Sequence, residues 1–250
     1  MATFLQNQPL LTVMLQCENP ETAIGRIRNA NCLGAEAYGL QAESLLREYQ
    51  TPAVYEKIFK EMGGRPVYVT NYRSAQNKGK TDEELAEGLL ALARSGATLC
   101  DVMGDYFCPH PEELTDDPVA IEKQMLLIEQ LHREGAEVLM SSHVLKFTPA
   151  ERVLEIAREQ VRRGADIVKI VTGAETMEQQ IENLRITDLL KRELGSPFLF
   201  LSGGMSAIHR RLGMKLGCCM GLCVYEHDHL STKAQPLLST IKTGRDSIDF

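Results

Sequence analysis

The stretch Gly164–Gly173, which reads GADIVKIVTG, holds a run of β-branched apolar residues between two glycines. Such a run is typical of a strand that is buried on both faces, as in a parallel sheet. Lys169 interrupts the run, although burial disfavours a charged amine. Its side chain therefore either extends its head to solvent or serves as a neutral nucleophile toward a carbonyl group.

Strand-like runs and helical patterns alternate along the whole chain. Candidate strands cover Leu11–Leu15, Ala37–Gln41, Pro66–Asn71, Thr98–Met103, Glu137–Ser142, Ile167–Val171, Phe198–Leu201 and Cys219–Val224. Candidate helices, which carry apolar residues at helical spacing, cover Glu21–Asn31, Pro52–Met62, Asp82–Arg94, Pro118–Glu134, Ala150–Arg163, Met177–Glu193, Ala207–Lys215 and Leu237–Thr243. Local signals agree with these bounds. Thr81 and Glu84 have capping-box spacing, and Thr148-Pro149 predicts a cap followed by Pro at the first helical position.

Eight strands that alternate with helices over about 250 residues predict a (β/α)₈ barrel. A doubly wound open sheet is the alternative, but no G-x-G-x-x-G pattern follows an early strand. No linker or low-complexity segment interrupts the pattern, so we expect one catalytic domain over residues 1–250.

The composition is that of an ordinary soluble protein, with 44% hydrophobic and 24% charged residues. A net charge of −7 with interspersed charges argues against nucleic acid or an anionic membrane as a partner. No apolar run approaches the roughly 20 residues that span a bilayer. Met1–Leu15 lacks a basic start and a cleavage pattern, so we expect no signal peptide. Seven cysteines, an odd number, favour reduced thiols and a cytoplasmic location.

A barrel gathers its catalytic groups at the carboxyl ends of the strands. Lys169 lies on the sixth candidate strand, His143 directly follows the fifth, and Arg73 follows the third. Ser202-Gly203-Gly204 ends the seventh. We therefore expect these residues to face one mouth. Cys108-Pro109-His110, after the fourth strand, is more typical of an ordinary loop than of a site.

The residues at this mouth suit chemistry on a carbonyl group. A neutral lysine amine forms an iminium with a ketone, and the iminium acidifies the adjacent C–H bond. His143 can then remove a proton and return it to a leaving group. Arg73 and Arg210 can bind a carboxylate or phosphate bidentately, and their charges would favour the neutral amine. The structural alternatives are a hydrogen-bonded loop histidine and two surface ion pairs.

Ser141-Ser142-His143, followed by Thr148-Pro149 and Gly164–Lys169, resembles the histidine and lysine segments of the type I 3-dehydroquinate dehydratases. Those enzymes are (β/α)₈ barrels that use a lysine Schiff base and a histidine acid/base. The resemblance implies a lyase that removes water from a cyclic 3-keto acid such as 3-dehydroquinate, giving 3-dehydroshikimate in the shikimate pathway of aromatic amino acid biosynthesis. It implies Lys169 and His143 as catalytic residues, and neither a cofactor nor a metal.

The resemblance also implies substrate-binding residues. His209-Arg210 lies where the family has Ser-Arg, whose arginine binds the substrate carboxylate. Ser231–Gln235 matches the spacing of the family's Ser-Ala-Pro-Gly-Gln, whose Ser and Gln line the substrate site. Thr70–Arg73 resembles the family's Thr-x-Arg with one extra residue. Arg73, Arg210, Ser231 and Gln235 are the resulting predictions. The family is often dimeric, so the resemblance allows a homodimer.

Several polar positions of the family are changed in this chain. On the second strand, Gly39 and Gln41 lie where the family has Glu-x-Arg. Asn77 lies where the family has the Glu that supports the catalytic histidine, and Met103 lies where it has a Glu on the fourth strand. After the histidine, Val144 and Leu145 lie where the family has Asp and Phe. Asp101 is kept. The chain therefore reads as a divergent dehydratase or as a relative that acts on another keto acid, and a biosynthetic or catabolic role stays open.

Three alternatives remain. Lys169–Gly173 and Ser202–Gly204 also resemble deoxyribose-phosphate aldolase, but Phe200 lies where that enzyme has a second lysine. A barrel that has lost catalysis and serves as a binding protein is the second. A metal site is the third, built from Cys218, Cys219, Cys223, His227 and His229. No Cys-x-x-Cys pair is present, and Cys219 and Cys223 fit inward core positions of the last strand.

Overall fold

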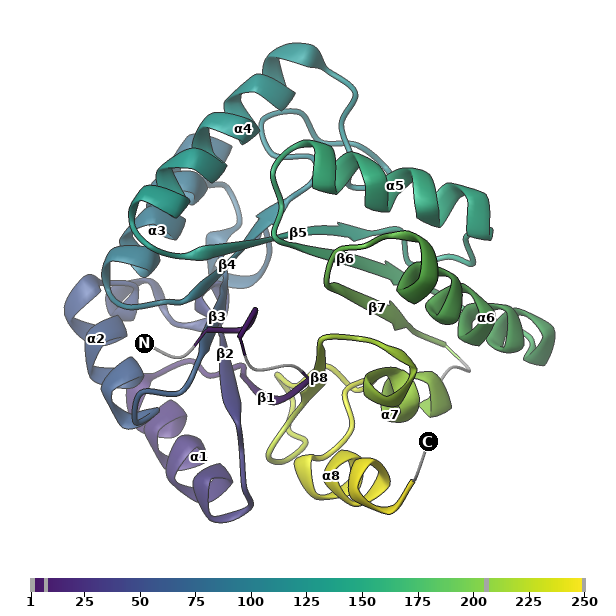
Figure 1. Cartoon of the computed structure of the whole chain (residues 1–250). Coiled ribbons are helices and arrows are strands. Elements are labelled where there is room, and N and C mark those ends of the chain that lie inside the picture. The colour runs from purple at the N-terminus through teal and green to yellow at the C-terminus, as the bar shows by residue number, and fades with distance from the viewer. Residues whose placement is uncertain (1–2, 7–8, 205–206, 249–250) are drawn as a thin grey trace.

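The computed structural model describes residues 3–6, 9–204 and 207–248. Within these residues the strands are β1 (Leu10–Leu15), β2 (Ala37–Gln41), β3 (Val67–Thr70), β4 (Leu99–Met103), β5 (Glu137–His143), β6 (Ile167–Thr172), β7 (Phe198–Ser202) and β8 (Met220–Cys223). The helices are α1 (Pro20–Cys32), α2 (Pro52–Glu61), α3 (Asp82–Arg94), α4 (Pro118–Arg133), α5 (Ala150–Arg162), α6 (Met177–Glu193), α7 (Ala207–Leu216) and α8 (Leu238–Ser247), with short 3₁₀ turns at Ala42–Ser44, Arg47–Tyr49 and Ala75–Asn77. The helices surround the strands (Figure 1).

All pairings in the sheet are parallel, in the order β7-β6-β5-β4-β3-β2-β1-β8. The two outer strands meet through a backbone hydrogen bond from Cys219 N to Phe198 O of 2.9 Å, which leaves the barrel nearly closed. The predicted (β/α)₈ barrel is confirmed. Every predicted strand and helix is present, although α8 extends to Ser247 rather than Thr243.

Local capping explains where several helices begin. The Asn19 side chain accepts a hydrogen bond from Thr22 N at the start of α1. The predicted capping box at Thr81 is confirmed, because Thr81 and Glu84 bond reciprocally. The predicted cap at Thr148 is wrong. Pro149 occupies the N-cap of α5, and the Thr148 hydroxyl donates instead to Lys146 O.

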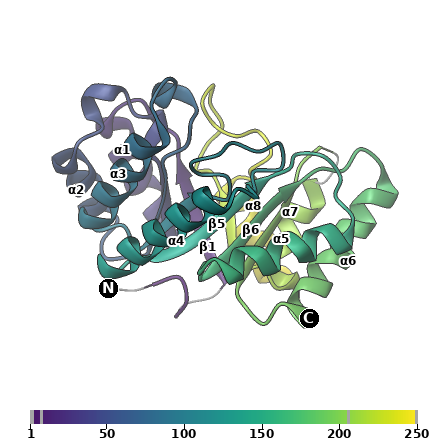
Figure 2. The same cartoon turned by 90° about the horizontal axis from the view of Figure 1, so that it is seen from above.

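The strand register brings the polar interior residues to one level. Ser141 of β5 lies beside Lys169 of β6, and Lys169 lies beside Leu199 of β7. The loop from β4 to α4 and the loop from β8 to α8 rise on the same side of the barrel (Figure 2). That side holds the carboxyl ends of the strands, where barrel enzymes place their chemistry.

Candidate active site

A cavity of about 190 Å³ opens at the carboxyl end of the barrel. Its lining includes both predicted catalytic residues, Lys169 and His143, and two predicted substrate-binding residues, Arg210 and Gln235. The other lining residues are Met14, Gln41, Tyr68, Tyr72, Leu145, Val171, Leu201, Leu222 and Thr232. The expectation that Lys169 and His143 share one mouth is met, since both line this cavity.

The Lys169 amine is buried and surrounded by polar groups. Only 4% of the residue is exposed, so its head does not reach bulk solvent. Its Nζ donates to Asp101 Oδ2 at 2.9 Å, to Tyr72 Oη at 2.7 Å and to Tyr68 Oη at 3.0 Å. Both tyrosine hydroxyls also donate to Asp101 Oδ2, and Ser141 donates to Oδ1 at 2.6 Å. The amine is thus held in one place at the floor of the cavity.

Burial and charge set the protonation of the groups around the amine. Burial alone would raise the pKa of Asp101, but the Lys169 charge and the hydrogen bonds from Ser141, Tyr68 and Tyr72 outweigh it and lower that pKa. Burial, and then the Asp101 charge, raise the pKa values of Tyr68 and Tyr72 well above the usual range. Asp101 is therefore a carboxylate, and both tyrosines stay protonated as hydrogen-bond donors.

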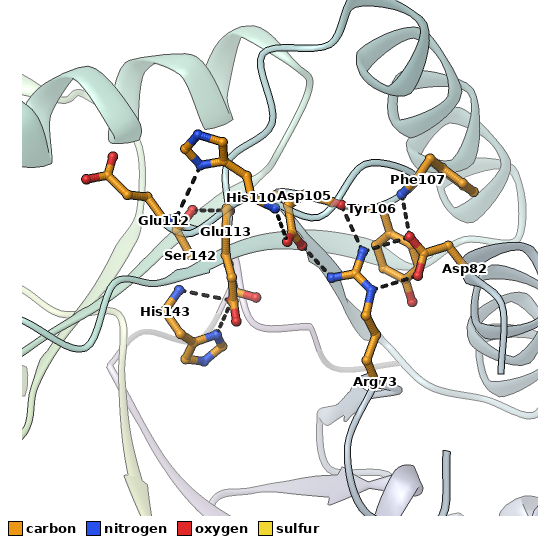
Figure 3. A network of polar contacts seen from close by, with 12 residues as sticks. Arg73, Asp82, Asp105, Tyr106, Phe107, His110, Glu112, Glu113, Ser142 and His143 are labelled. Carbon is orange, nitrogen blue, oxygen red and sulfur yellow. Dashed lines mark hydrogen bonds and ion pairs between the residues drawn. The ribbon is translucent and has the colours of Figure 1, made fainter. Parts of the chain in front are cut away.

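His143 is oriented by a carboxylate that sequence reasoning missed. Glu113 Oε2 lies 2.6 Å from His143 Nδ1 and accepts a hydrogen bond from the His143 backbone N–H at 3.0 Å (Figure 3). With Nδ1 bonded to a carboxylate, Nε2 is the nitrogen available to exchange a proton. The ring also packs edge-on against Tyr72, with 5.4 Å between centroids. The geometry of this pair suits acid/base chemistry at Nε2.

The backbone at Glu113 is held in an unusual conformation. Its φ of 46° lies in the left-handed region, which is costly for a side chain other than glycine. Ser142 Oγ donates to Glu113 O at 2.8 Å. A Cβ on Gly104 would come within 2.5 Å of the same carbonyl oxygen, so only glycine fits there. The signal available in the sequence was indirect, since the family's supporting Glu is absent at Asn77 and the loop after β4 contains Glu112 and Glu113.

Arg73 does not reach the Lys169 cavity. Its guanidinium binds Asp82 through two hydrogen bonds of 2.7 Å, and Nη1 donates to Asp105 Oδ1 at 2.8 Å (Figure 3). It lines a neighbouring surface cavity together with Tyr72, His143 and Glu113. Tyr72 also lines the Lys169 cavity, which Arg73 does not. The extra residue in Thr70–Arg73 accounts for this, because one more residue changes which side chain points inward.

Met14 occupies the space beside Gly39 on β2. A Cβ at Gly39 would lie 2.2 Å from Met14 Sδ and 3.1 Å from Tyr68, so no larger side chain fits without rearrangement. Met14 and Tyr68 thus replace the polar group that the family resemblance implies here. Gln41 still lines the cavity, as an amide in place of an arginine.

A buried amide, Asn77, and a buried carboxyl group, Glu43, lie outside the lining of the cavity. Asn77 is fully buried and donates to Asn71 Oδ1 at 2.7 Å and to Tyr72 O at 3.0 Å, so it fixes the loop that carries Tyr72. Glu43 is buried and accepts hydrogen bonds from the Thr70 hydroxyl at 2.9 and 3.0 Å. Burial raises the pKa of Glu43 to about 7.

Arg210 and Gln235 lie together at the rim of the cavity. Arg210 Nε donates to Ser202 O at 2.9 Å, and burial lowers its pKa to about 10, which still leaves it charged near neutral pH. The Gln235 residue is 5% exposed, and its Oε1 has no hydrogen-bond partner within the part of the chain that the structure describes. An unpaired buried amide oxygen is costly, and a bound molecule that carries a hydrogen-bond donor would satisfy it.

Ser231 does not line the cavity. Its hydroxyl accepts from Asp228 N at 2.9 Å and donates to Asp228 O at 3.1 Å, which stabilises the loop after β8. Thr232, one residue further, lines the cavity instead. His209 is also turned away. It lies 2.8 Å from the Thr187 hydroxyl, and burial lowers its pKa to about 4, so it is neutral.

The candidate metal ligands after β8 are divided between core and surface. Cys218, Cys219 and Cys223 are buried, whereas His227 and His229 are exposed. Across residues 3–6, 9–204 and 207–248, no group of three or more His, Cys, Asp or Glu side chains has an arrangement that could hold a metal ion. In the same residues no helix is long and apolar enough to cross a membrane.

The protein is thus a nearly closed (β/α)₈ barrel with a buried lysine at the carboxyl end of its strands. A histidine bound to a carboxylate and an arginine line the same cavity. A sequence model of the type I 3-dehydroquinase family matches residues 11–243. The chain belongs to this family.

Two curated relatives are named 3-dehydroquinate dehydratase. The relative from Geobacillus thermodenitrificans is 27% identical over 70% of this chain and 65% of its own length. The relative from Alkaliphilus oremlandii is 29% identical over 62% of this chain and 58% of its own length. The matched region therefore spans less than two thirds of the length of each relative.

Solved structures share the fold. The 3-dehydroquinate dehydratase from Geobacillus kaustophilus aligns with a TM-score of 0.81 over 96% of this chain and 91% of that chain, at 19% identity. The enzyme from Enterococcus faecalis aligns with a TM-score of 0.78 over the full length of both chains, at 15% identity. At these identities the likeness supports the barrel itself and carries no further argument.

Proposed function

We propose that this chain is a Schiff-base lyase that eliminates water from a cyclic 3-keto acid, with 3-dehydroquinate as the reference substrate and 3-dehydroshikimate as its product. The observation that carries the proposal is the shared cavity of Lys169 and His143. A buried amine and a histidine that exchanges protons through Nε2 face the same small space. Family membership supports the same reaction.

The reaction begins at the substrate ketone. The Lys169 ammonium first gives a proton to the Asp101 carboxylate, and the neutral amine then adds to the carbonyl carbon. Loss of the carbonyl oxygen as water gives an iminium that withdraws electrons from the adjacent carbon. The Asp101 carboxylate and the Tyr72 hydroxyl, both within hydrogen-bond distance of Nζ, are placed to exchange the protons of this step.

His143 performs the elimination. Its Nε2 removes the proton α to the iminium, and the Glu113 carboxylate stabilises the imidazolium that forms. The imidazolium then returns the proton to the β-hydroxyl, which leaves as water. Hydrolysis of the iminium releases the conjugated enone and restores the amine. The iminium supplies the electron sink, so the mechanism requires no cofactor or metal.

Arg210 and Gln235 bind the substrate carboxylate at the rim of the cavity. Arg210 is charged, and the side-chain NH₂ of Gln235 can donate to the carboxylate, whereas the unpaired Gln235 Oε1 accepts and can pair only with a donor such as a substrate hydroxyl. Arg73 and Ser231 do not bind the substrate in this proposal. Each stabilises a loop of the site through its hydrogen bonds.

The test combines trapping with an assay. Wild type incubated with 3-dehydroquinate and borohydride is expected to gain the mass of the reduced adduct at Lys169, and the assay to show the conjugated enone. Lys146, whose side chain is 72% exposed near the mouth, offers the matched control. Lys146→Met should still be trapped. Absence of an adduct on wild type, or its presence on another lysine, contradicts the proposal.

The family relation leaves two further properties as proposals. We infer a cytoplasmic enzyme of the shikimate pathway, supported by seven cysteines that all lie within the described residues and form no disulfide there. We also infer a homodimer, on the family resemblance alone. Cell fractionation and light scattering of the purified chain test these two points, and a monomer at micromolar concentration would contradict the second.

A further inference from the structure

One wall of the Lys169 cavity has no role in the proposed dehydration. His143 and Lys169 lie on neighbouring strands, β5 and β6, whereas β8, β1, β2 and β3 follow one another on the other side of the barrel. Each of these four strands contributes one residue to the lining of the cavity, in the order Leu222, Met14, Gln41 and Tyr68. We call these four residues the far wall, because they lie across the barrel from the reacting groups.

Three residues of the far wall belong to the hydrophobic core. Leu222, Met14 and Tyr68 are buried and pack in one apolar cluster of the barrel interior. Met14 also fills the space beside Gly39, where a Cβ would lie 2.2 Å from its Sδ. The apolar core therefore forms this part of the cavity surface, and no polar side chain fits at Gly39 without rearrangement.

The far wall offers a substrate few hydrogen-bond partners. The Tyr68 hydroxyl is already engaged, since it donates to Asp101 and accepts from Lys169. No carboxylate lines the cavity within the part of the chain that the structure describes, and the nearby Asp101 carboxylate already accepts from four side chains. The amide of Gln41 is thus the polar group that this wall can offer to a substrate hydroxyl.

The unpaired acceptor of the cavity lies away from the far wall. Gln235 Oε1 has no partner among the described residues and lies with Arg210 at the rim. A hydroxyl on the carbon that bears the carboxylate would satisfy this oxygen while Arg210 holds the carboxylate. In 3-dehydroquinate that hydroxyl is the leaving group. The cavity therefore provides for the reacting hydroxyl and offers little to the other hydroxyls of the ring.

A hydroxyl that is buried against an apolar surface loses its hydrogen bonds to water, and an apolar pocket disfavours an added hydroxyl by up to about 10²-fold. We propose that the preferred substrate is a cyclic 3-keto acid with the β-hydroxyl on its carboxylate carbon and no hydroxyl on the ring carbons that face the far wall. This inference rests on the proposed dehydration and names the substrate class of the same site. Met14 is then a residue that determines specificity.

The first test compares two substrates. The probe is 1-hydroxy-3-oxocyclohexane-1-carboxylate, which is 3-dehydroquinate without its other hydroxyls. Loss of its hydroxyl and the adjacent proton as water gives 3-oxocyclohex-1-ene-1-carboxylate, a conjugated enone that is followed by its ultraviolet absorbance. The measured quantity is the specificity ratio, defined as kcat/KM for the probe divided by kcat/KM for 3-dehydroquinate.

The same ratio is measured for the relative from Geobacillus thermodenitrificans, so that the intrinsic reactivities of the two compounds cancel. We expect the specificity ratio of this chain to be at least about tenfold higher than that of the relative. An equal or lower ratio overturns the inference.

Variants then test the far wall itself. Met14→Gln places a donor and an acceptor on the wall at similar volume, so the specificity ratio should fall about tenfold, through a gain for 3-dehydroquinate. Gln41→Leu makes the wall fully apolar and should raise the ratio. Because each ratio compares two substrates of one variant, it does not depend on how much of that variant folds. An unchanged ratio in both variants overturns the inference.

Two controls separate polarity from packing and from location. Met14→Leu keeps the wall apolar and should keep the wild-type ratio. Met214→Gln repeats the substitution at a methionine that packs beside Gly221 in the same way, 2.3 Å from a Cβ built there, but does not line the cavity. It should also keep the wild-type ratio. A fall in either control as large as that in Met14→Gln contradicts the role of the far wall.

This inference can fail separately from the proposed dehydration. Turnover of 3-dehydroquinate with a specificity ratio no higher than that of the relative contradicts the substrate class and leaves the dehydration standing. Absence of a borohydride adduct at Lys169 with both compounds contradicts the dehydration, and the inference with it.

Discussion

Strands β5 and β6 carry His143 and Lys169 where the family resemblance places them, whereas β2 and the loop after β3 carry a different set of groups. On the second side, Gly39 is backed by Met14, Gln41 is an amide, Tyr72 lies in the cavity and Arg73 is bound to Asp82 and Asp105. In the proposed mechanism the reacting groups thus lie on strands other than those that carry the changed groups.

The two sides are nevertheless joined through hydrogen bonds. Tyr68 and Tyr72, from β3 and its loop, contact the Lys169 amine, and Glu113, from the loop after β4, holds His143. Tyr68 and Tyr72, on the side that differs from the family resemblance, thus contact the lysine on the side that agrees with it. Glu113, from the loop after β4, provides the carboxylate that the family position at Asn77 lacks.

The largest effect on turnover is expected at Lys169, on the side that agrees with the family resemblance. Lys169→Met keeps most of the buried stem and removes the amine, so turnover of 3-dehydroquinate should fall on the order of 10³-fold or more. Intact mass after borohydride treatment should show no adduct, while circular dichroism stays that of the wild type. An adduct on this variant would assign the nucleophile to another residue.

His143→Ala separates iminium formation from elimination. The variant should still be trapped by borohydride, because Lys169 is unchanged, but turnover should fall about 10²- to 10⁴-fold through loss of acid/base catalysis. Single-turnover kinetics with 3-dehydroquinate measure both steps. Unchanged turnover would remove His143 from the mechanism.

Glu113→Gln tests the contact between the loop after β4 and His143. The amide keeps the shape and can still accept from Nδ1, but it lacks the charge that stabilises the imidazolium, so kcat should fall about 10- to 100-fold. The pH profile of kcat should shift as well, which a purely structural role would not produce. Glu112→Gln is the matched control, since the neighbouring Glu112 pairs with Arg152 instead. Equal effects of both variants would contradict the assignment.

The smallest predicted effect concerns the free energy of unfolding, through the buried carboxyl group of Glu43 after β2. Burial raises the pKa of Glu43 from 4.5 to about 7, so the folded state favours its protonated form. The stability that the protonated Glu43 side chain contributes to the fold is fully present below about pH 4.5 and is lost as the pH rises through about 7. The free energy of unfolding of Glu43→Gln, minus that of wild type, should therefore rise by about 2–3 kcal/mol between pH 5 and pH 9. Urea unfolding at both pH values measures this difference. A constant difference would show that Glu43 does not titrate as described.

The fold and the centre of the site follow from patterns that sequence alone carries. Eight apolar runs at regular spacing predict the barrel, and Lys169 within one run and His143 at the end of another follow from strand position. Gln235 and Arg210 reach the cavity because their motifs keep family spacing. These predictions depend on position along a regular element, which the chain encodes locally.

The remaining site residues depend on loop conformation. The extra residue before Arg73 moves that side chain to Asp82 and Asp105, and a local turn with Asp228 withdraws Ser231. Glu113 reaches His143 only through a left-handed backbone that Ser142 and Gly104 accommodate. Contacts between distant loops decide these cases, and no periodic pattern in one sequence reports them.

The most direct test of the comparison is the kcat/KM for 3-dehydroquinate, measured beside the relative from Geobacillus thermodenitrificans under the same conditions. Loss of charge-assisted contacts at Gly39 and Gln41, each worth about 1.5–3 kcal/mol, predicts a value lower by about ten- to several-hundred-fold, mainly through a raised KM. The same substrate should still form a trapped adduct at Lys169. Equal kcat/KM in the two proteins would contradict the account and indicate an ordinary dehydroquinase with a rearranged pocket.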